Sequence, residues 1–381
     1  MTAAAESATR PATGDRPALV LRSLTKHFGT AVAVDGIDLD VRPGEFLTLL
    51  GPSGSGKTTT LRMVAGFMAP TSGSIEIDGS DMTRVPPHRR DVGMVFQNYA
   101  LFPHMTAAEN VAFPLRMRRR PGAEIKKRVA EALDLVKLGS FGDRYPRQLS
   151  GGQQQRIALA RAVVFEPRLL LMDEPLGALD RKLRESLQLE IIRVSRELGA
   201  TVLYVTHDQE EALVMSDRIA IFSMGRIEQL GSGADLYDRP ASLFVADFIG
   251  ESNILRGRYE VDGGAGGWMT HDDARWRVGA ASASRSDVAS GAAAALVVRP
   301  ERMRVLTDGA AADGLNTADA TVDEVLYLGP DLKYQLELPW GQRISIREPR
   351  EVGARELERG DRVRVGWKVE DGLLVADPAS A

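Results

Sequence analysis

The sequence of 381 residues contains no cysteine. Without thiolates the chain forms no disulfide, iron–sulfur cluster or thiolate zinc site, and this composition fits a reducing cytosol. Long apolar runs are also missing, because no uncharged apolar stretch approaches the ~20 residues that a membrane-spanning helix requires. We therefore expect a soluble chain, which can still dock against a membrane complex.

The sequence also has little net charge. Its 52 acidic and 48 basic residues are well mixed and give −4, so charge indicates neither a nucleic acid nor a lipid surface as partner. The tight basic run RMRRR at 116–120 is more typical of a solvated helix face or turn than of a binding patch. Residues 1–16 lack the apolar segment of a signal peptide or anchor, and their small and polar side chains predict a disordered tail.

Residues 17–248 alternate apolar strands with helical patterns. Strands are expected at 19–24, 36–41, 46–50, 74–79, 168–172, 201–206 and 218–222. Helices are expected at 60–68, 124–136, 153–165 and 181–199, the last with Gly199 as its C-cap. Four of the strand segments are nearly continuous apolar runs, which are typical of a parallel sheet covered on both faces. This section is therefore predicted to be an α/β domain.

The pattern changes near residues 247–252, and we predict a second domain at 249–381. Segments rich in glycine and small residues, 263–267 and 281–295, resemble loops. Period-two alternation follows at 296–306, 321–329, 333–339, 342–349 and 361–377. Short strands separated by turns predict a small antiparallel barrel or sandwich, and two small barrels would also fit the length.

The first chemical motif is GPSGSGKT at 51–58, which follows the strand 46–50 and opens a helix. Its glycines allow backbone N–H groups to converge on phosphate, Lys57 supplies a cation, and the Thr58 hydroxyl is placed to hold Mg²⁺. A glycine turn with an incidental Lys-Thr is the alternative, but the strand and helix on either side argue against it. The residues expected to bind the nucleotide here are Gly51, Pro52, Ser53, Gly54, Ser55, Gly56, Lys57, Thr58 and Thr59.

A second motif, RLLLMDEP at 168–175, carries two carboxylates at the end of a buried strand. Ligands of open α/β sheets gather at this edge. Asp173 is expected to hold Mg²⁺ through its water shell, and Glu174 to deprotonate the attacking water. Alone, Asp-Glu-Pro would be an ordinary loop before a helix. Together with the phosphate loop it indicates an ATPase or GTPase.

The third motif, LSGGQQQR at 149–156, places Ser150, Gly151 and Gly152 at the start of a helix. Such a start binds anions, because unpaired N–H groups and the helix dipole face outward. The loop 51–58 already provides one phosphate site, and the chain has one set of Mg²⁺ ligands. We therefore expect the second site to serve the nucleotide of another copy.

These motifs resemble the ATP-binding subunits of ABC transporters, in which two domains close head to tail around ATP. The resemblance implies a P-loop, RecA-like nucleotide-binding domain with a helical insert at about 98–160. It also implies roles for further residues: Phe28 stacks on adenine, Gln97 approaches Mg²⁺ and water, Asp180 forms the D-loop, and His207 contacts the γ-phosphate. Taken singly, Phe28 could be a core or turn residue, His207 a polar strand cap, and Gln97 uninformative.

The segments 97–118 and 239–253 and the β-rich tail look like binding-protein-dependent importers with a C-terminal, OB-like TOBE domain. Within these, polyamine (spermidine/putrescine) importers are most similar, while sugar, glycerol-phosphate, sulfate and ferric-iron systems are alternatives. The resemblance implies a translocating ATPase with ATP and Mg²⁺ as cofactors. It also implies a homodimer, permease partners, an external solute-binding protein reached indirectly, no nucleic acid, and a peripheral place on the cytoplasmic face of the membrane.

The insert is expected to reach the permease through Leu101, Phe102 and Phe113, although these residues could instead belong to its core. A cytosolic ABC ATPase of DNA repair or translation would need a long coiled coil or tandem cassettes. The about 90 residues between 58 and 149 are too few for that coiled coil. A P-loop small-molecule kinase would have no use for LSGGQ or His207. We therefore expect an importer ATPase.

Overall fold

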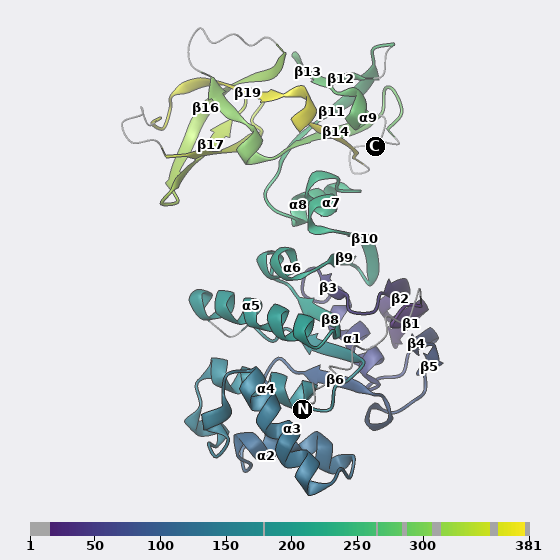
Figure 1. Ribbon diagram of the computed structural model, residues 1–381. Coiled ribbons are helices and arrows are strands. Elements are labelled where there is room, and N and C mark those ends of the chain that lie inside the picture. Colours follow the sequence, from purple (N-terminus) through teal and green to yellow (C-terminus); the bar gives the residue numbers. More distant parts are fainter. Residues whose placement is uncertain are drawn as a thin grey trace, which may run out of the picture. The chain divides into compact units, whose positions relative to one another are not determined.

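The computed structural model describes residues 16–177, 180–263, 266–283, 288–306, 314–350 and 357–377 (Figure 1). The predicted disordered tail falls almost wholly outside these ranges. The chain divides into two compact units, Met1–Gly233 and Ala234–Ala381. No helix within the described ranges is both long and apolar enough to cross a membrane.

The first unit is built on a six-stranded sheet in the order β10-β9-β3-β8-β7-β6. Its strands are β3 (Phe46–Leu50), β6 (Val92–Val95), β7 (Leu169–Asp173), β8 (Thr201–Thr206), β9 (Arg218–Ser223) and β10 (Arg226–Gly231). All neighbours pair in parallel except β9 and β10. The four continuous apolar runs therefore form the strands of a parallel sheet, as expected.

Both faces of this sheet are covered, because side chains along β7 and β8 alternate between two cores. Leu170 and Tyr204 lie in one core with α-helical residues, whereas Leu171 and Val205 lie in the other. The second core is closed by α1 (Lys57–Ala65) and by a four-stranded antiparallel sheet. That sheet has the order β2-β1-β4-β5, with β1 (Leu19–Phe28), β2 (Ala31–Val41), β4 (Ser72–Ile77) and β5 (Ser80–Asp81).

Helices α2 (Ala107–Met117), α3 (Gly122–Leu135) and α4 (Gly151–Val163) lie together on one side of the unit (Figure 1). They occupy the segment where the helical insert was expected. Helices α5 (Arg181–Glu197) and α6 (Gln209–Met215) pack against each other beside β8. The basic run 116–120 ends α2 and continues into an exposed turn.

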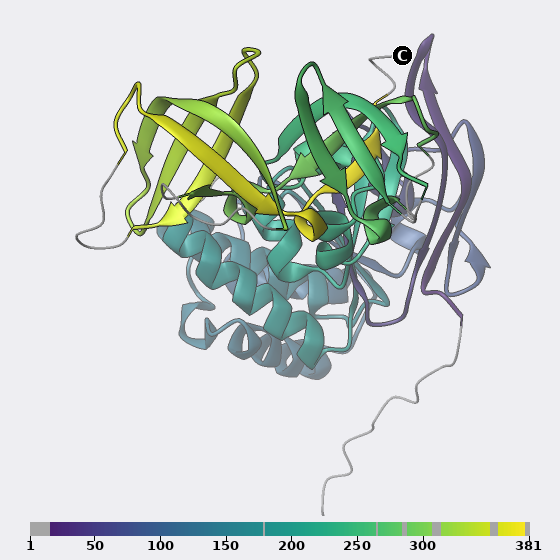
Figure 2. The same ribbon diagram turned by 90° about the horizontal axis from the view of Figure 1, so that it is seen from above.

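The second unit begins with two short helices, α7 (Gly233–Asp238) and α8 (Leu243–Phe248), and continues as strands. One sheet has the order β13-β12-β11-β14-β20 and the other β15-β19-β16-β17-β18. Figure 2 shows the two sheets of this unit. Every pairing in both sheets is antiparallel, and their shared core contains the buried Trp276 and Trp367. An antiparallel β domain was predicted for this section.

The strands of these sheets are β11 (Asn253–Val261), β12 (Gly267–His271), β13 (Ala274–Val278), β14 (Ala293–Val298), β15 (Arg304–Leu306), β16 (Leu315–Tyr327), β17 (Asp331–Glu337), β18 (Arg343–Pro349), β19 (Arg362–Lys368) and β20 (Leu373–Ala376). Strands β14 to β20 overlap the predicted period-two segments, although β14, β16 and β17 begin earlier, whereas β11, β12 and β13 were not predicted. The stretch 281–295, expected to be loop, contains the end of α9 (Ala280–Ala283) and the start of β14. Its alanines are small enough to pack in the core, as Ala294 does.

Candidate active site

The phosphate loop connects β3 to α1, and two of its glycines are required by close backbone contacts. A Cβ on Gly51 would lie 2.3 Å from the Phe222 carbonyl oxygen, and one on Gly56 would lie 2.5 Å from the Ala33 oxygen. Gly56 also has φ +105°, which L side chains rarely adopt. The loop therefore needs glycine at these two positions because of backbone packing, whereas the sequence predicted these glycines for another reason, the close approach of phosphate.

Lys57 is buried against the same loop. Its Nζ donates hydrogen bonds to the carbonyl oxygens of Gly51 (2.7 Å) and Pro52 (2.8 Å). Burial lowers the pKa of Lys57, while the charges of Glu174 and Asp173 oppose that change. The cation thus lies inside the loop, close to the two acidic residues that follow β7.

Thr58 and Asp173 meet across the two motifs. The Thr58 hydroxyl donates to Asp173 Oδ1 at 3.1 Å. Asp173 is buried at the end of β7, and this burial raises the pKa of its carboxyl group, while the bond from Thr58 works in the opposite direction. A hydroxyl and a carboxylate at this distance form an oxygen-only donor pair, the kind that Mg²⁺ prefers.

Three side chains predicted to act in hydrolysis converge from different strands. Glu174 Oε2 lies 3.4 Å from Gln97 Nε2 and 3.3 Å from His207 Nδ1. Glu174 follows β7, Gln97 follows β6, and His207 follows β8. The parallel sheet brings these strand ends to one edge, which explains why residues far apart in sequence form one cluster.

Phe28 ends β1 at the two-residue hairpin to β2, where it pairs with Ala31. Its side chain is 50 % exposed, so Phe28 is not a core residue. Lys26 Nζ lies 5.3 Å from the centre of the ring. An exposed aromatic ring beside a cation is available to stack on a planar, negatively charged ligand.

Ser150 caps α4, and its polar contacts stay within that helix. The Ser150 hydroxyl accepts from Gln153 N, and Gln153 Oε1 accepts from Ser150 N at 2.9 Å, which is a capping box. Ser150 and Gly151 are exposed, whereas Gly152 is buried where a Cβ would lie 3.0 Å from a Leu183 methyl group of α5. Asp180 caps α5 by accepting from Leu183 N.

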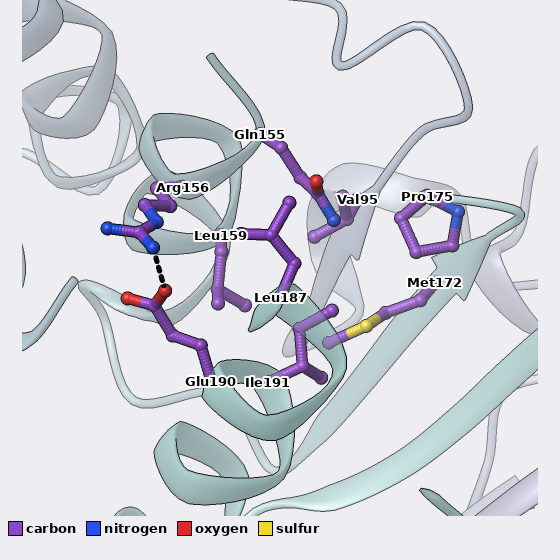
Figure 3. A pocket seen from close by; sticks show the side chains of 9 residues that line it. All are labelled: Val95, Gln155, Arg156, Leu159, Met172, Pro175, Leu187, Glu190 and Ile191. Carbon is purple, nitrogen blue, oxygen red and sulfur yellow. Dashed lines mark ion pairs between the residues drawn. The ribbon is translucent and has the colours of Figure 1, made fainter. Parts of the chain in front are cut away.

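A small pocket lies behind α4, between this helix and α5 (Figure 3). Arg156 and Glu190 form an ion pair of 2.6 Å across the two helices. Gln155 is buried, and within the described residues its amide has no hydrogen-bond partner. The lining side chains are Val95, Gln155, Arg156, Leu159, Met172, Pro175, Leu187, Glu190 and Ile191.

One polar network beside the site was not predicted. Arg184 of α5 forms an ion pair with Asp208, the residue that follows His207, and approaches Glu211. Glu211 also accepts hydrogen bonds from Tyr204 and Thr206. Only the adjacency of Asp208 to His207 was visible in the sequence, because the contact with Arg184 depends on how α5 packs against α6.

Comparisons with known proteins extend over nearly the whole chain. The ABC transporter family matches residues 34–177, and the TOBE domain family matches residues 296–375. The spermidine/putrescine import ATP-binding protein PotA of Rubrobacter xylanophilus is 50 % identical over 362 residues, which cover 94 % of each chain. PotA of Thermobifida fusca is 49 % identical over 364 residues, also 94 % of each chain. This chain belongs to the ABC transporter ATP-binding proteins.

Solved structures of ABC cassettes agree with this assignment. The dimeric cassette MJ0796 bound to ADP and Pi is 36 % identical, with a TM-score of 0.50, and the match covers 56 % of this chain and 98 % of that one. A second dimeric structure of MJ0796 has a TM-score of 0.51 at 35 % identity. The predicted ABC ATPase with a C-terminal TOBE domain is confirmed, and the small-molecule kinase is excluded.

Proposed function

We propose that this ABC ATPase powers the import of spermidine and putrescine through a membrane permease. The observation that carries the proposal is the similarity to PotA proteins along 94 % of the chain. It includes the TOBE section at 296–375, beyond the ATP-binding motifs that all ABC ATPases share. The other solutes considered above would require the same ATPase chemistry, so the solute must be tested by transport.

In this proposal Phe28 stacks on the adenine, and the N–H groups of the loop 51–59 surround the phosphates. Thr58 and Asp173 would hold Mg²⁺, together with phosphate and water oxygens. The ion would neutralise phosphate charge and orient the terminal phosphate. Within the described residues no three His, Cys, Asp or Glu side chains group as a metal site, so the nucleotide itself would complete the coordination, as is usual for Mg²⁺.

Glu174 is proposed to take the proton from the attacking water as general base. Its distances of 3.4 Å to Gln97 and 3.3 Å to His207 support a shared water and γ-phosphate site. Gln97 would orient the water, and His207 would contact the γ-phosphate. The imidazole is exposed beside Glu174, so it is accessible to a nucleotide bound on the phosphate loop.

Two copies are proposed to enclose each ATP. Ser150 and Gly151 lie exposed at the start of α4, where the helix dipole favours an anion. Asp180 lies exposed at the start of α5. In a head-to-tail homodimer, Ser150, Gly151 and Gly152 of one copy would face the γ-phosphate on the other, and hydrolysis would release the contact.

The permease is proposed to dock on the helical insert. Leu101 packs partly against the core of the first unit, so for this residue the alternative of a structural role has support. Phe102 and Phe113 are half-buried, with ring centres 4.6 Å apart. This aromatic pair offers an apolar contact to a cytoplasmic segment of a permease, which would hold the ATPase on the inner face of the membrane. The external solute-binding protein would act through that permease.

Uptake of labelled solutes tests the proposal. The gene is deleted from its host and replaced by the wild-type chain, by Glu174→Gln, or by Glu185→Gln, a control on the exposed Arg181–Glu185 pair of α5. We expect wild type and Glu185→Gln to restore spermidine and putrescine uptake and Glu174→Gln to fail. Polyamine uptake that survives deletion, with uptake of a sugar or sulfate lost instead, would contradict the polyamine assignment but not the ATPase.

A further inference from the structure

An ion pair connects the first turn of α5 with the segment that follows His207. Arg184 Nη1 lies 2.7 Å from Asp208 Oδ2, and Arg184 Nε lies 3.8 Å from Glu211 Oε1. Arg184 N also donates to the carbonyl oxygen of Asp180 at 2.9 Å. The Arg184 side chain therefore connects the start of α5, next to Asp180, with the loop that contains His207.

Glu211 is the buried end of this network. Its Oε2 accepts hydrogen bonds from the Tyr204 hydroxyl and the Thr206 hydroxyl, both at 2.8 Å. Burial raises the pKa of Glu211, and burial together with Glu211 raises the pKa of Tyr204 well above its usual value. A buried carboxylate disfavours folding unless it is well paired. Glu211 meets this condition, because two hydroxyls and Arg184 pair with its carboxylate.

The network fixes the backbone on both sides of His207. Asp208 N donates to the Thr206 hydroxyl at 3.0 Å. Asp208 Oδ1 caps α6 by accepting from the backbone N–H groups of Glu210 (2.9 Å) and Glu211 (3.1 Å). His207 lies between these fixed neighbours, with an exposed imidazole whose Nδ1 is 3.3 Å from Glu174. These groups hold the backbone from which the imidazole extends, and the imidazole itself contacts Glu174.

We propose that Arg184 is a positioning residue, which orients His207 toward the γ-phosphate through Asp208 and Glu211. The same contact couples His207 to the start of α5, where Asp180 is expected to face the partner copy. This inference rests on the role proposed for His207. It goes beyond that role because Arg184, which would align His207, lies outside the nucleotide motifs.

A purely structural role for Arg184 is the competing explanation, and the packing of α5 argues against it. Leu187, Ile191 and Val194 are buried along this helix and join the core of the first unit. These apolar contacts hold α5 in place independently of the partly exposed guanidinium. Loss of Arg184 should therefore disturb the loop at His207 more than the fold.

The test is a double-mutant cycle of Arg184→Gln and His207→Ala, assayed as ATP turnover by the full-length chain. Arg184→Gln should lower kcat roughly ten- to a hundredfold, the effect expected when a catalytic group is displaced by about 1 Å. KM for ATP should stay within about twofold, because the phosphate loop is unchanged. In the His207→Ala background, Arg184→Gln should cause no further loss, and Arg184→Lys, which keeps the charge, should retain much of the activity.

Arg193→Gln is the matched control, since Arg193 lies on the same helix and forms an ion pair of 2.8 Å with Glu197, away from His207. It should turn over at the wild-type rate. If Arg184→Gln lowered kcat by the same factor in the wild-type and His207→Ala backgrounds, the inference would be overturned, although His207 could still act in catalysis. A large drop in melting temperature together with a raised KM would also overturn it. If His207→Ala itself had normal turnover, the role of His207 would fail first, and the positioning inference with it.

Discussion

At the scale of single residues, Glu174, the proposed general base, has an unusual backbone conformation. Its φ of +43° lies in the left-handed region, which costs a non-glycine residue about 1–3 kcal/mol and recurs at functional sites. The strained turn is anchored, because Glu174 N donates to the Val205 carbonyl oxygen at 3.0 Å. The backbone therefore aims the carboxylate at Gln97 and His207, so replacing only its charge should leave the geometry intact.

Glu174→Gln is expected to bind ATP and accumulate as a closed dimer. Loss of a general base should lower turnover by roughly 10²–10⁴-fold, while the phosphate loop keeps its affinity. Phosphate release measures the turnover, and size-exclusion chromatography with ATP measures the dimer. Hydrolysis at nearly the wild-type rate would show that Glu174 is not the base.

Ser150→Arg is expected to show that the two phosphate motifs have different roles. The isolated subunit should still bind ATP, because Lys57 and Thr58 are untouched, but ATP-driven dimerisation should disappear. Nucleotide titration of the monomer and light scattering with ATP measure the two properties.

The capping role of Ser150 calls for a control, since a lost N-cap costs about 1 kcal/mol. Ser150→Asp keeps a capping oxygen at the start of α4 but places a negative charge before the γ-phosphate. It should preserve the melting temperature and still prevent dimerisation. Loss of ATP binding together with dimerisation in Ser150→Arg would mean that α4 serves the nucleotide of its own chain.

At the scale of elements, three residues of α4 on the side of α5 differ in how well they are packed and paired. Gly152 packs closely on Leu183, and Arg156 pairs with Glu190. Gln155 lines the pocket between the two helices (Figure 3), and its buried amide has no hydrogen-bond partner among the described residues. An unsatisfied buried polar group costs roughly 1–3 kcal/mol, so this position should accept an apolar side chain.

Gln155→Met should raise the free energy of unfolding by about 1 kcal/mol, since methionine keeps the length and removes the unpaired amide. Gln154→Met is the matched control on the neighbouring residue, whose Nε2 donates to the carbonyl oxygens of Pro146 (3.0 Å) and Leu149 (3.2 Å). That variant should be destabilised. Urea unfolding followed by circular dichroism measures both, and equal destabilisation of the two variants would contradict the interpretation of Gln155.

The elements also show what could be predicted from sequence. The strands 46–50 and 201–206 were predicted with their observed bounds, because continuous burial leaves an unbroken apolar run. Strand β6 was missed, since it has only four residues and includes Gly93. Helix α2 was missed although Thr106 and Glu109 form a capping box. The sequence motifs predicted the nucleotide residues. Arg184 and Glu211 could not be predicted in this way, because only the packing of α5 on α6 brings them to the site.

At the scale of the whole molecule, each compact unit has its own core within the described residues. Two clusters lie within residues 19–222, and another lies within 255–374. The four tryptophans, Trp268, Trp276, Trp340 and Trp367, all belong to the second unit. The longer helices, α3, α4 and α5, belong to the first. Tryptophan fluorescence therefore reports on the second unit, and the helical circular-dichroism signal reports mainly on the first.

This separation predicts how ATP changes thermal unfolding. In Glu174→Gln, which should not consume the ligand, ATP at about 100 times its Kd should stabilise the first unit by about 2.7 kcal/mol through binding alone, before any contribution from dimer formation. The helical transition should then rise by about 5–10 °C, while the tryptophan transition stays in place, because the nucleotide motifs lie outside the second unit. In the Lys57→Ala variant, whose phosphate loop is weakened, ATP should not raise the helical transition. If both transitions rose together, the two cores would unfold as one cooperative body, and the units would not be thermodynamically independent.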